Sequence, residues 1–575
     1  MANQLFRKKS IPLILKEAEQ GLSDSHGHHE GLKRVLTVRD LTFFGIAAVI
    51  GTGVFTAIGS ASYHGGPAVI LLFALTAVAC GFAAYCYAEF ASTIPVSGSA
   101  YTYSYVAFGE IFAWIIGWDL LMEYAIGNIA VAISWSQYFV RVLGGFGMHI
   151  PAWLTMDYFT AHKGYIAATE ALNSGTGETI STIDVGMRNT YTAWTTSPVL
   201  FGNVRLIMNI PALLIVALIT YIVYIGIRES KKANNLMVLI KLAVILFVII
   251  AGAFYVNPGN WSNFMPNGFS GVMSGVSAVF FAYIGFDAIS TTAEECRNPQ
   301  KDLPRAMFNT LIICTTLYII LTLVLTGMTN YSELNVADPL AFVFQNQNTR
   351  ASNWFAGVIS VSAIFVIASV LLVYQLGQPR IWMSMSRDGL LPKIFSRIHP
   401  KYKTPSFSTV LTGFVVGIPA LFLNLDVVIA LTSIGTLFAF VLVCGGVLVL
   451  QKQKNRPDSK FRVPYINSKF IIPILFILSV ALIAVYIPEH YSSLLREEGI
   501  PMLVFWMVAL IVTILSFVHS FSLIPVLGLL SCFYLMAQES HTNWYRFLIW
   551  LVIGLVIYFT YGYRNSKLNR IPDSI

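Results

Sequence analysis

Two short stretches of this sequence place glycine where an apolar helix is expected to continue. The first is a Gly-Thr-Gly run at residues 51–53, and the second is Phe-Ala-Tyr-Ile-Gly-Phe-Asp at residues 281–287. Glycine inside a helix costs about 1 kcal/mol relative to alanine, so both stretches favour unwound backbone. A broken helix presents free N–H groups, which attract a carboxylate, and free C=O groups, which attract an ammonium group. A pair of such breaks therefore suits a zwitterionic amino acid.

Two ionisable residues lie inside apolar runs, and the first is Lys241. A lysine buried in such a run can gain and lose a proton near neutral pH. Its ammonium would then occupy the place where a sodium ion sits in a sodium-driven relative. The alternative is that its four-carbon stem carries the ammonium about 6 Å back toward the membrane interface.

Glu123 is the second ionisable residue, near the middle of another apolar run. An unpaired carboxylate is expensive there, so Glu123 is a further candidate for carrying a proton. The alternative is a neutral carboxylic acid that ties helices together by hydrogen bonds. Asp287 directly follows the second break, and we expect it to cap the next half-helix rather than to contact a substrate.

The composition indicates an all-α integral membrane protein. The chain has 575 residues, of which 56% are hydrophobic and 11% are charged, whereas about 25% are charged in an average soluble domain. Apolar runs of about twenty residues, the length that spans a bilayer as a helix, recur along the chain. We expect about fourteen transmembrane helices, near residues 41–63, 67–88, 111–140, 203–227, 236–256, 270–293, 306–328, 354–380, 406–423, 427–450, 469–487, 501–518, 521–537 and 543–563.

The two breaks fall in the first and sixth of these helices. That spacing predicts two inverted five-helix repeats, each opening with a broken helix, an arrangement that marks the binding site of a transporter. The alternative for the Gly-Thr-Gly run is close packing against a neighbouring helix. We therefore expect a cytoplasmic segment at 1–40, a ten-helix inverted-repeat transport core at 41–450, and about four additional helices with a short cytoplasmic tail at 451–575.

The charges predict an orientation rather than a nucleic-acid partner. The net charge is +8, and most of the 36 Lys and Arg residues fall in alternate connecting segments. By the positive-inside rule both termini are cytoplasmic, in the plasma (cell inner) membrane. The first forty residues contain no cleavable signal pattern. On the outside, we expect residues 144–203 to form a polar cap and residues 330–353 to contain a short helix lying on the surface.

Other site classes find no support in the sequence. None of the six cysteines lies in a predicted outside loop, so we expect no structural disulfide. His26, His28 and His29 lie in a polar segment that favours a solvated linker over a metal site. Residues 11–20 fit a short amphipathic helix or a disordered tail equally well. We find no P-loop, nucleophile elbow or metal-ligand cluster, and so expect neither an enzyme nor a cofactor.

A set of motifs carries a resemblance to a known family. In order along the chain they lie at residues 31–36, 50–55, 87–90, 95–101, 117–124, 234–241, 280–287, 294–304, 387–392 and 546–562. Together they make the sequence resemble the cationic amino acid transporter (CAT) branch of the amino acid–polyamine–organocation (APC) superfamily. The chain departs from the shorter bacterial pattern in the larger loop at 144–203 and in roughly two extra helices at 470–517.

The resemblance implies a ten-helix inverted-repeat core and proton-coupled or facilitated amino acid transport. It implies that the backbone of residues 49–53 holds the substrate carboxylate and amine, and that carbonyls of the second break take the ammonium group. Lys241 matches the lysine that replaces sodium in this family, and Glu123 is the second proton-coupling candidate. The substrate-binding residues expected in this way are Val49, Gly51, Thr52, Gly53, Phe281, Ala282 and Ile284.

We therefore predict an amino acid/proton symporter that works by alternating access, with the amino acid, the proton and membrane lipid as its partners. The alternatives are a facilitated exchanger without proton coupling and a transporter-like amino acid sensor, which the short tails disfavour. The side-chain pocket should involve the third helix and the eighth helix near residues 364–374, a stretch that contains no acidic residue and ends in the bulky Tyr374. This favours neutral over cationic amino acids.

Overall fold

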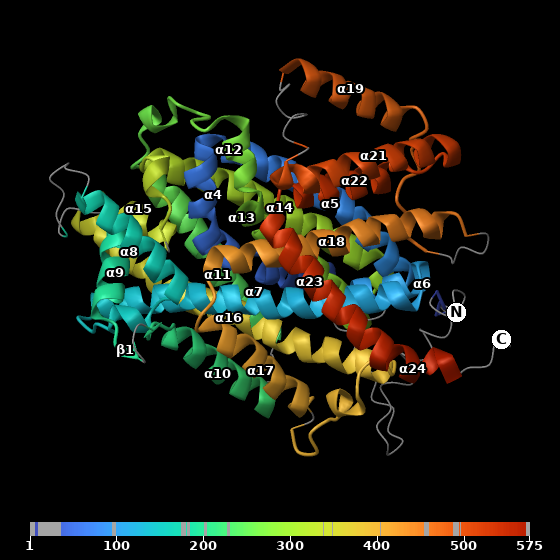
Figure 1. Ribbon diagram of the computed structural model, residues 1–575, viewed down its shortest axis with the longest axis horizontal. Coiled ribbons are helices and arrows are strands. Elements are labelled where there is room, and N and C mark those ends of the chain that lie inside the picture. The colour runs from blue at the N-terminus through green and yellow to red at the C-terminus, as the bar shows by residue number, and fades with distance from the viewer. Residues whose placement is uncertain are drawn as a thin grey trace.

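The computed structural model describes residues 6–9, 36–94, 99–173, 180, 185–200, 204–226, 231–336, 338–347, 349–402, 404–453, 459–486, 494 and 496–570. These residues form long helices that run nearly along one axis (Figure 1). The described strands are β1 (Val199–Leu200) and β2 (Val204–Arg205), which pair antiparallel. The fold is therefore all-α, as predicted.

The helices of the core follow in sequence order. They are α3 (Val38–Val49), the π-helix η1 (Gly53–Ala57), α4 (Ile58–Gly65), α5 (Val69–Thr93), α6 (Ser99–Ala107), α7 (Glu110–Gly145), α8 (Tyr158–Asn173), α9 (Val185–Thr196), α10 (Ile210–Ile225), α11 (Lys231–Ala253), α12 (Gly268–Ser274), α13 (Val276–Phe281), the 3₁₀-helix η5 (Phe286–Glu295), α14 (Pro299–Met328), α15 (Pro339–Gln345), α16 (Arg350–Arg387), α17 (Ser406–Ala420) and α18 (Leu425–Gln451). The C-terminal helices are α19 (Ile471–Tyr486), α21 (Ile500–His519), α22 (Leu523–Ala537), α23 (His541–Ile557) and α24 (Tyr563–Asn565).

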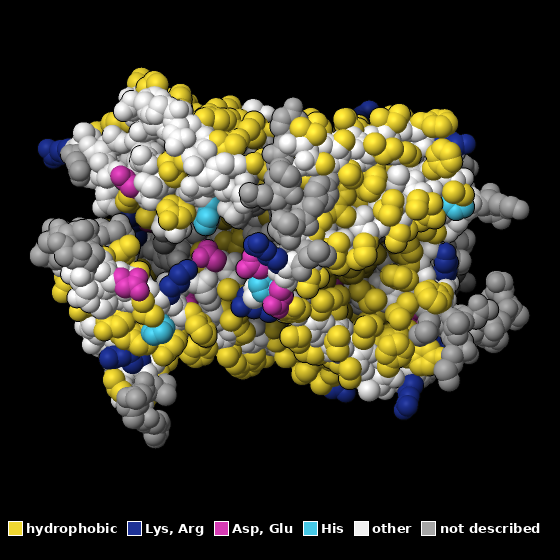
Figure 2. Space-filling model, turned by 45° about the horizontal axis from the view of Figure 1, so that its top comes forward, with side chains coloured by type: hydrophobic (Ala, Val, Ile, Leu, Met, Phe, Trp, Pro, Cys, Tyr) yellow, Lys and Arg dark blue, Asp and Glu magenta, His cyan; other side chains and the backbone are white. Residues whose placement is uncertain are grey.

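The lengths and composition of these helices fit a membrane. Within the described residues, nine helical stretches are long and apolar enough to cross a bilayer, and four shorter helices are also apolar. The first of the nine, Gly53–Thr93, turns at Gly66, whose φ of 62° few other residues adopt. Figure 2 shows broad areas of apolar side chains on one face of the molecule. Such a surface is suited to lipid rather than to water.

Helices five spans apart in the sequence pack against each other. In the core α5 contacts α14, α7 contacts α16, and α10 contacts α17. At the centre α3 packs on η5 while α4 packs on α13, so the two broken helices lie antiparallel. This pairing is the pattern that two inverted five-helix repeats produce.

The C-terminal helices pack on the outside of this core. The contacts of α22 are with α18 and α5, and α23 lies against α18 and α7. Helices α21 and α19 then follow outward, since α21 packs on α22 and α19 packs on α21 (Figure 1). Helices α22 and α23 therefore make the main helix-to-helix contacts between the C-terminal part and the core.

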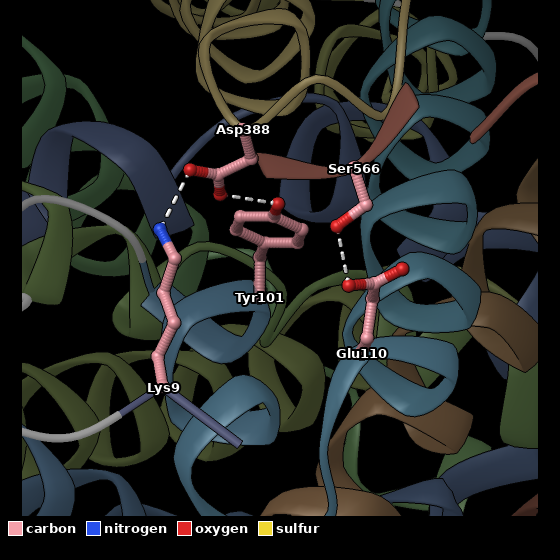
Figure 3. A network of polar contacts seen from close by, with 5 residues as sticks. All are labelled: Lys9, Tyr101, Glu110, Asp388 and Ser566. Atoms are coloured by element: carbon pink, nitrogen blue, oxygen red, sulfur yellow. Dashed lines mark hydrogen bonds and ion pairs between the residues drawn. The ribbon is translucent and has the colours of Figure 1, made fainter. Parts of the chain in front are cut away.

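A polar network joins described residues near both ends of the chain to the core (Figure 3). Lys9 Nζ pairs with Asp388 Oδ1 at 2.6 Å, and Tyr101 Oη donates to Asp388 Oδ2 at 2.6 Å. Nearby, Ser566 Oγ donates to Glu110 Oε2 at 2.5 Å. The network ties the N-terminal segment and the C-terminal segment to α6, α7 and the end of α16.

The connecting segments are more structured than their composition suggests. The polar segment 144–203 contains α8 and α9, which pack together through Tyr165, Tyr191 and Trp194. Segment 330–353 contains the short helix α15, as predicted, but most of its residues are buried, so the expectation that this helix lies on the surface is wrong. All six cysteines are buried and free. The predictions for residues 11–20 and for His26, His28 and His29 fall outside the described residues.

Candidate functional site

The first break lies where the sequence predicts it. Helix α3 ends at Val49, Ile50 is extended with ψ of 101°, and helical backbone resumes in η1 at Gly53. A Cβ on Gly53 would lie 2.4 Å from Cα of Ala282, so the backbone approaches too closely for any other residue.

The second break is also present and touches the first. Helix α13 ends at Phe281, and η5 begins at Phe286 after Gly285, which has a φ of 119°. A Cβ on Gly285 would lie 2.9 Å from the carbonyl carbon of Ala48. The two breaks therefore meet at two points, one on each side of the unwound backbone.

Several backbone groups at the breaks have no hydrogen-bond partner among the described residues. Among the described residues we find no hydrogen bond from the N–H groups of Gly51 and Thr52. The carbonyls of Phe281, Ala282 and Ile284 likewise accept none in the described part of the chain. Since buried backbone groups are nearly always paired, these donors and acceptors are available to a bound ligand.

Val49 differs from the other predicted substrate-binding residues. Its carbonyl accepts a hydrogen bond from Tyr318 Oη at 3.2 Å. A ligand would have to share or displace that bond to use this carbonyl.

A small pocket lies beside the second break. It is lined by residues of α3, of the second break, of η5, of α7 and of α16, namely Ala48, Glu123, Tyr124, Ile284, Gly285, Asp287, Ala288, Val370, Val373 and Tyr374. The rings of Tyr124 and Tyr374 meet edge to face, 5.5 Å apart. Of the residues predicted from sequence, Ile284, Glu123 and Tyr374 line this pocket, and Val370 and Val373 also come from the predicted stretch 364–374.

Comparisons with known proteins agree with this geometry. The family model for the amino acid permease matches residues 36–573. The chain belongs to the amino acid permease family. This membership confirms the resemblance to the APC superfamily and identifies an integral membrane permease rather than an enzyme.

Three relatives show the range of names within this similarity. The permease is 38% identical to the methylthioribose transporter of Bacillus subtilis, over 99% of this chain and 100% of that protein. It is 37% identical to the branched-chain amino acid permease BcaP of the same organism, over the same shares. It is 30% identical to the cationic amino acid transporter 2, vacuolar, of Arabidopsis thaliana, over 96% of this chain and 92% of that protein.

Lys241 of the permease lies apart from the pocket. Its Nζ donates to the carbonyl oxygen of Ala47 at 2.7 Å, and the side chain is 1% exposed. The ammonium therefore binds the free carbonyl end of α3, and the alternative that it reaches back to the membrane interface is wrong. Lys241 is not among the residues that line the pocket.

Two buried acidic residues on α7, Glu123 and Asp119, have carboxylate oxygens without a hydrogen-bond partner in the part of the chain that the structure describes, in contrast to Lys241. Among the described residues, Glu123 Oε2 has no hydrogen-bond partner, and neither carboxylate oxygen of Asp119, one helical turn away, has one. Both side chains are buried. Two carboxyls this close in an apolar environment favour at most one negative charge between them.

Asp287 caps the N-terminal end of η5 as expected, although not from the N-cap position, because its carboxyl accepts hydrogen bonds from the backbone N–H groups of Gly285, Asp287 and Ala288. The N-cap of η5 is Gly285, and Asp287 lies in the first turn of η5 with its side chain at the pocket. Gly285 holds the cap because its φ of 119° is unfavourable for a residue with a side chain. The negative charge still lies at the positive end of the η5 dipole.

Sequence reasoning assigned Asp287 to helix capping rather than to the pocket, and it did not single out Tyr124 on the third helix, which is α7 in the structure. It looked for acidic groups on the eighth helix alone, which is α16 in the structure, whereas the two carboxyls come from α7 and η5. The spacing of Val370 and Tyr374 is a sequence signal for the α16 wall of the pocket, because residues four apart share one face of a helix.

Proposed function

We propose that this permease carries an amino acid together with a proton by alternating access. The observation that carries the proposal is the contact between two broken helices that both have unpaired backbone groups, with a pocket lined by Ile284 of the second break and by Glu123. The two ends of a zwitterion match these two kinds of backbone group.

In this proposal the substrate carboxylate binds the N–H groups of the first break, at Gly51 and Thr52. The substrate ammonium binds the free carbonyls of Phe281, Ala282 and Ile284. Neither interaction needs a charged side chain, which leaves the ionisable residues free for proton coupling.

We assign proton coupling to Lys241 and Glu123. When Lys241 is protonated, it holds the carbonyl end of α3 by a charge-assisted hydrogen bond, and losing the proton weakens that bond. Glu123 faces the pocket with one unpaired oxygen and lies near Asp287. A proton on Glu123 removes a charge that burial disfavours.

The proposed substrate side chain is neutral. Ala288, Val370 and Val373 give the pocket an apolar wall. The relative BcaP is named for branched-chain amino acids, whereas other relatives are named for cationic ones. Because the carboxyls of Glu123 and Asp287 also line the pocket and could attract a cationic side chain, arginine must be tested directly. We place the protein in the plasma (cell inner) membrane with both termini cytoplasmic.

The test is uptake of radiolabelled alanine and arginine into proteoliposomes, with and without an inward proton gradient, against protein-free liposomes. We expect alanine to accumulate and the accumulation to collapse with a protonophore. Equilibration without accumulation would favour a facilitated exchanger. Failure to transport either amino acid would favour the sensor, and accumulation of arginine as effectively as alanine would overturn the neutral substrate class.

A further inference from the structure

One carboxyl outside the ten-helix core reaches one of the two broken helices. Glu539 lies in the short connection between α22 and α23, and its side chain is buried. Ser277 Oγ of α13 donates to Glu539 Oε1 at 2.5 Å, and Asn543 Nδ2 donates to Oε2 at 3.3 Å. The C-terminal helices thus hold α13 through a side-chain bond.

The bond lies close to the proposed substrate site. Ser277 is four residues before Phe281, the last residue of α13, which is about 6 Å along a helix. The carbonyl of Ser277 also accepts from Ser433 Oγ of α18 at 2.9 Å. Glu539 and Ser433 therefore fix the half-helix that leads into the second break from two sides.

The surroundings of Glu539 contain few charges. On α23, Arg546 Nη1 binds Asn543 Oδ1 at 3.0 Å, so the nearest cation acts through Asn543. His541 contacts the Tyr545 ring, and Glu497 accepts from Tyr545 Oη at 3.3 Å. No hydrogen bond or ion pair between these three groups and Glu539 is found in the described part of the chain.

We propose that Glu539 is a positioning residue through which the C-terminal helices hold α13 and make its movement sensitive to pH. This inference rests on the proposed function, because α13 leads into the proposed substrate site. Its role differs from that of Lys241 and Glu123, since it sets how easily α13 moves and not how many protons are carried.

The direction of the pH effect follows from burial. Burial raises the pKa of Glu539 to about 7, against the opposing effect of the hydrogen bonds from Ser277 and Asn543. A carboxyl that reaches water after α13 moves has an ordinary pKa near 4.3. The state in which Glu539 is buried against Ser277 has the higher pKa, and it therefore gains stability as pH falls. Low pH thus stabilises α13 in its present position. Raising the pH toward 7 progressively favours its release.

The test uses cysteine labelling of purified protein. Ala278, buried on α13, is replaced by cysteine as the reporter, and Ser274, exposed on α12, is replaced in a separate variant as the reference for thiol reactivity. The ratio of the two labelling rates should rise about threefold or more between pH 5.5 and 8. In a Glu539→Gln background the ratio should not change with pH.

Two further variants guard against a folding artefact. Glu498→Gln changes an exposed carboxyl of the neighbouring η8 (Glu497–Gly499) and should keep the pH response. Ser277→Ala removes the bond but keeps the carboxyl, and should raise labelling at low pH. An unchanged pH response in Glu539→Gln, or a ratio independent of pH in the otherwise unmodified protein, would overturn the proposal.

Transport assays separate this proposal from the proposed function. Substrate exchange without a proton gradient should depend less on pH in Glu539→Gln than in the unmodified protein, with the remaining dependence due to Lys241 and Glu123, while the accumulation ratio under a gradient should stay that of the unmodified protein. A changed accumulation ratio would contradict a purely positioning role. If the unmodified protein exchanges but does not accumulate substrate, proton coupling fails, and the labelling result still decides the role of Glu539.

Discussion

The two sides of the C-terminal end of α3 differ in packing and in hydrogen bonding. On one side Ala47 accepts a hydrogen bond from Lys241, and Tyr318 binds the carbonyl of Val49. On the other side Ala48 lines the pocket that contains Glu123 and Asp287. The first side is filled and hydrogen-bonded, and the second is hollow with unpaired polar atoms.

In the proposed mechanism, this arrangement would couple the proton site at Lys241 to the substrate site without direct contact between them. Ala47 and Ala48 are consecutive residues in one helical turn, so a shift of α3 on the lysine side moves the wall of the pocket. The bond from Lys241 is charge-assisted, and its loss therefore changes the position of α3 more than the loss of a neutral bond.

The largest effect is expected for Lys241→Ala. Removing a buried hydrogen bond to a charged group costs about 1.5–3 kcal/mol, which corresponds to roughly tenfold to a hundredfold. Uptake against a gradient should be abolished, whereas substrate binding measured by calorimetry should remain, because Lys241 does not line the pocket.

Tyr318→Phe is the matched control for Lys241→Ala. It removes a neutral hydrogen bond to the neighbouring carbonyl of Val49 and should cost about 1 kcal/mol. Accumulation should be reduced but should still depend on the proton gradient. Full accumulation by Lys241→Ala would show that the filled side of α3 has only a structural role.

Glu123→Gln should have the next largest effect. The substitution keeps the shape and hydrogen-bonding capacity of the side chain but removes the titrating proton. We expect the pH dependence of uptake to weaken and the maximal rate to fall about tenfold, a change of 1.4 kcal/mol. The measurement is the initial uptake rate across pH 5 to 8.

Asp119→Asn is the control for Glu123→Gln. Asp119 is equally buried and one turn away on α7, but it does not line the pocket. Its substitution should leave substrate selectivity unchanged. A pH profile of uptake that is unaltered in Glu123→Gln and altered in Asp119→Asn would show that Asp119, and not Glu123, is the carboxyl that carries the proton.

Much of the fold could be predicted because the signals are local. Apolar runs gave the transmembrane helices, and glycine at 51, 53 and 285 marked both breaks, since close backbone contact there depends on the absence of a side chain. The pairing of α7 with α16 followed from the repeat.

The pocket was harder to predict because it is assembled from distant segments. Asp287 and Glu123 are far apart in the sequence, and only tertiary packing brings both to Ala48. The hydrogen bond between Glu539 and Ser277 spans 262 residues, and nothing in the local sequence indicates it. Helices α8 and α9 were missed because their polar composition resembles that of a loop.

Asp287→Asn should give the smallest effect and should act on selectivity. The side chain lies at the hollow side of α3 and at the positive end of η5, so its charge is partly offset by the helix dipole. Neutralising it removes an attraction for a cationic substrate but leaves the apolar wall of Val370 and Val373 in place. Inhibition of alanine uptake by arginine should weaken a few-fold, while inhibition by leucine should not change. If inhibition by arginine and by leucine weakened equally, we would conclude that Asp287 maintains the structure of the second break. Residues of α16 would then determine selectivity for the substrate side chain.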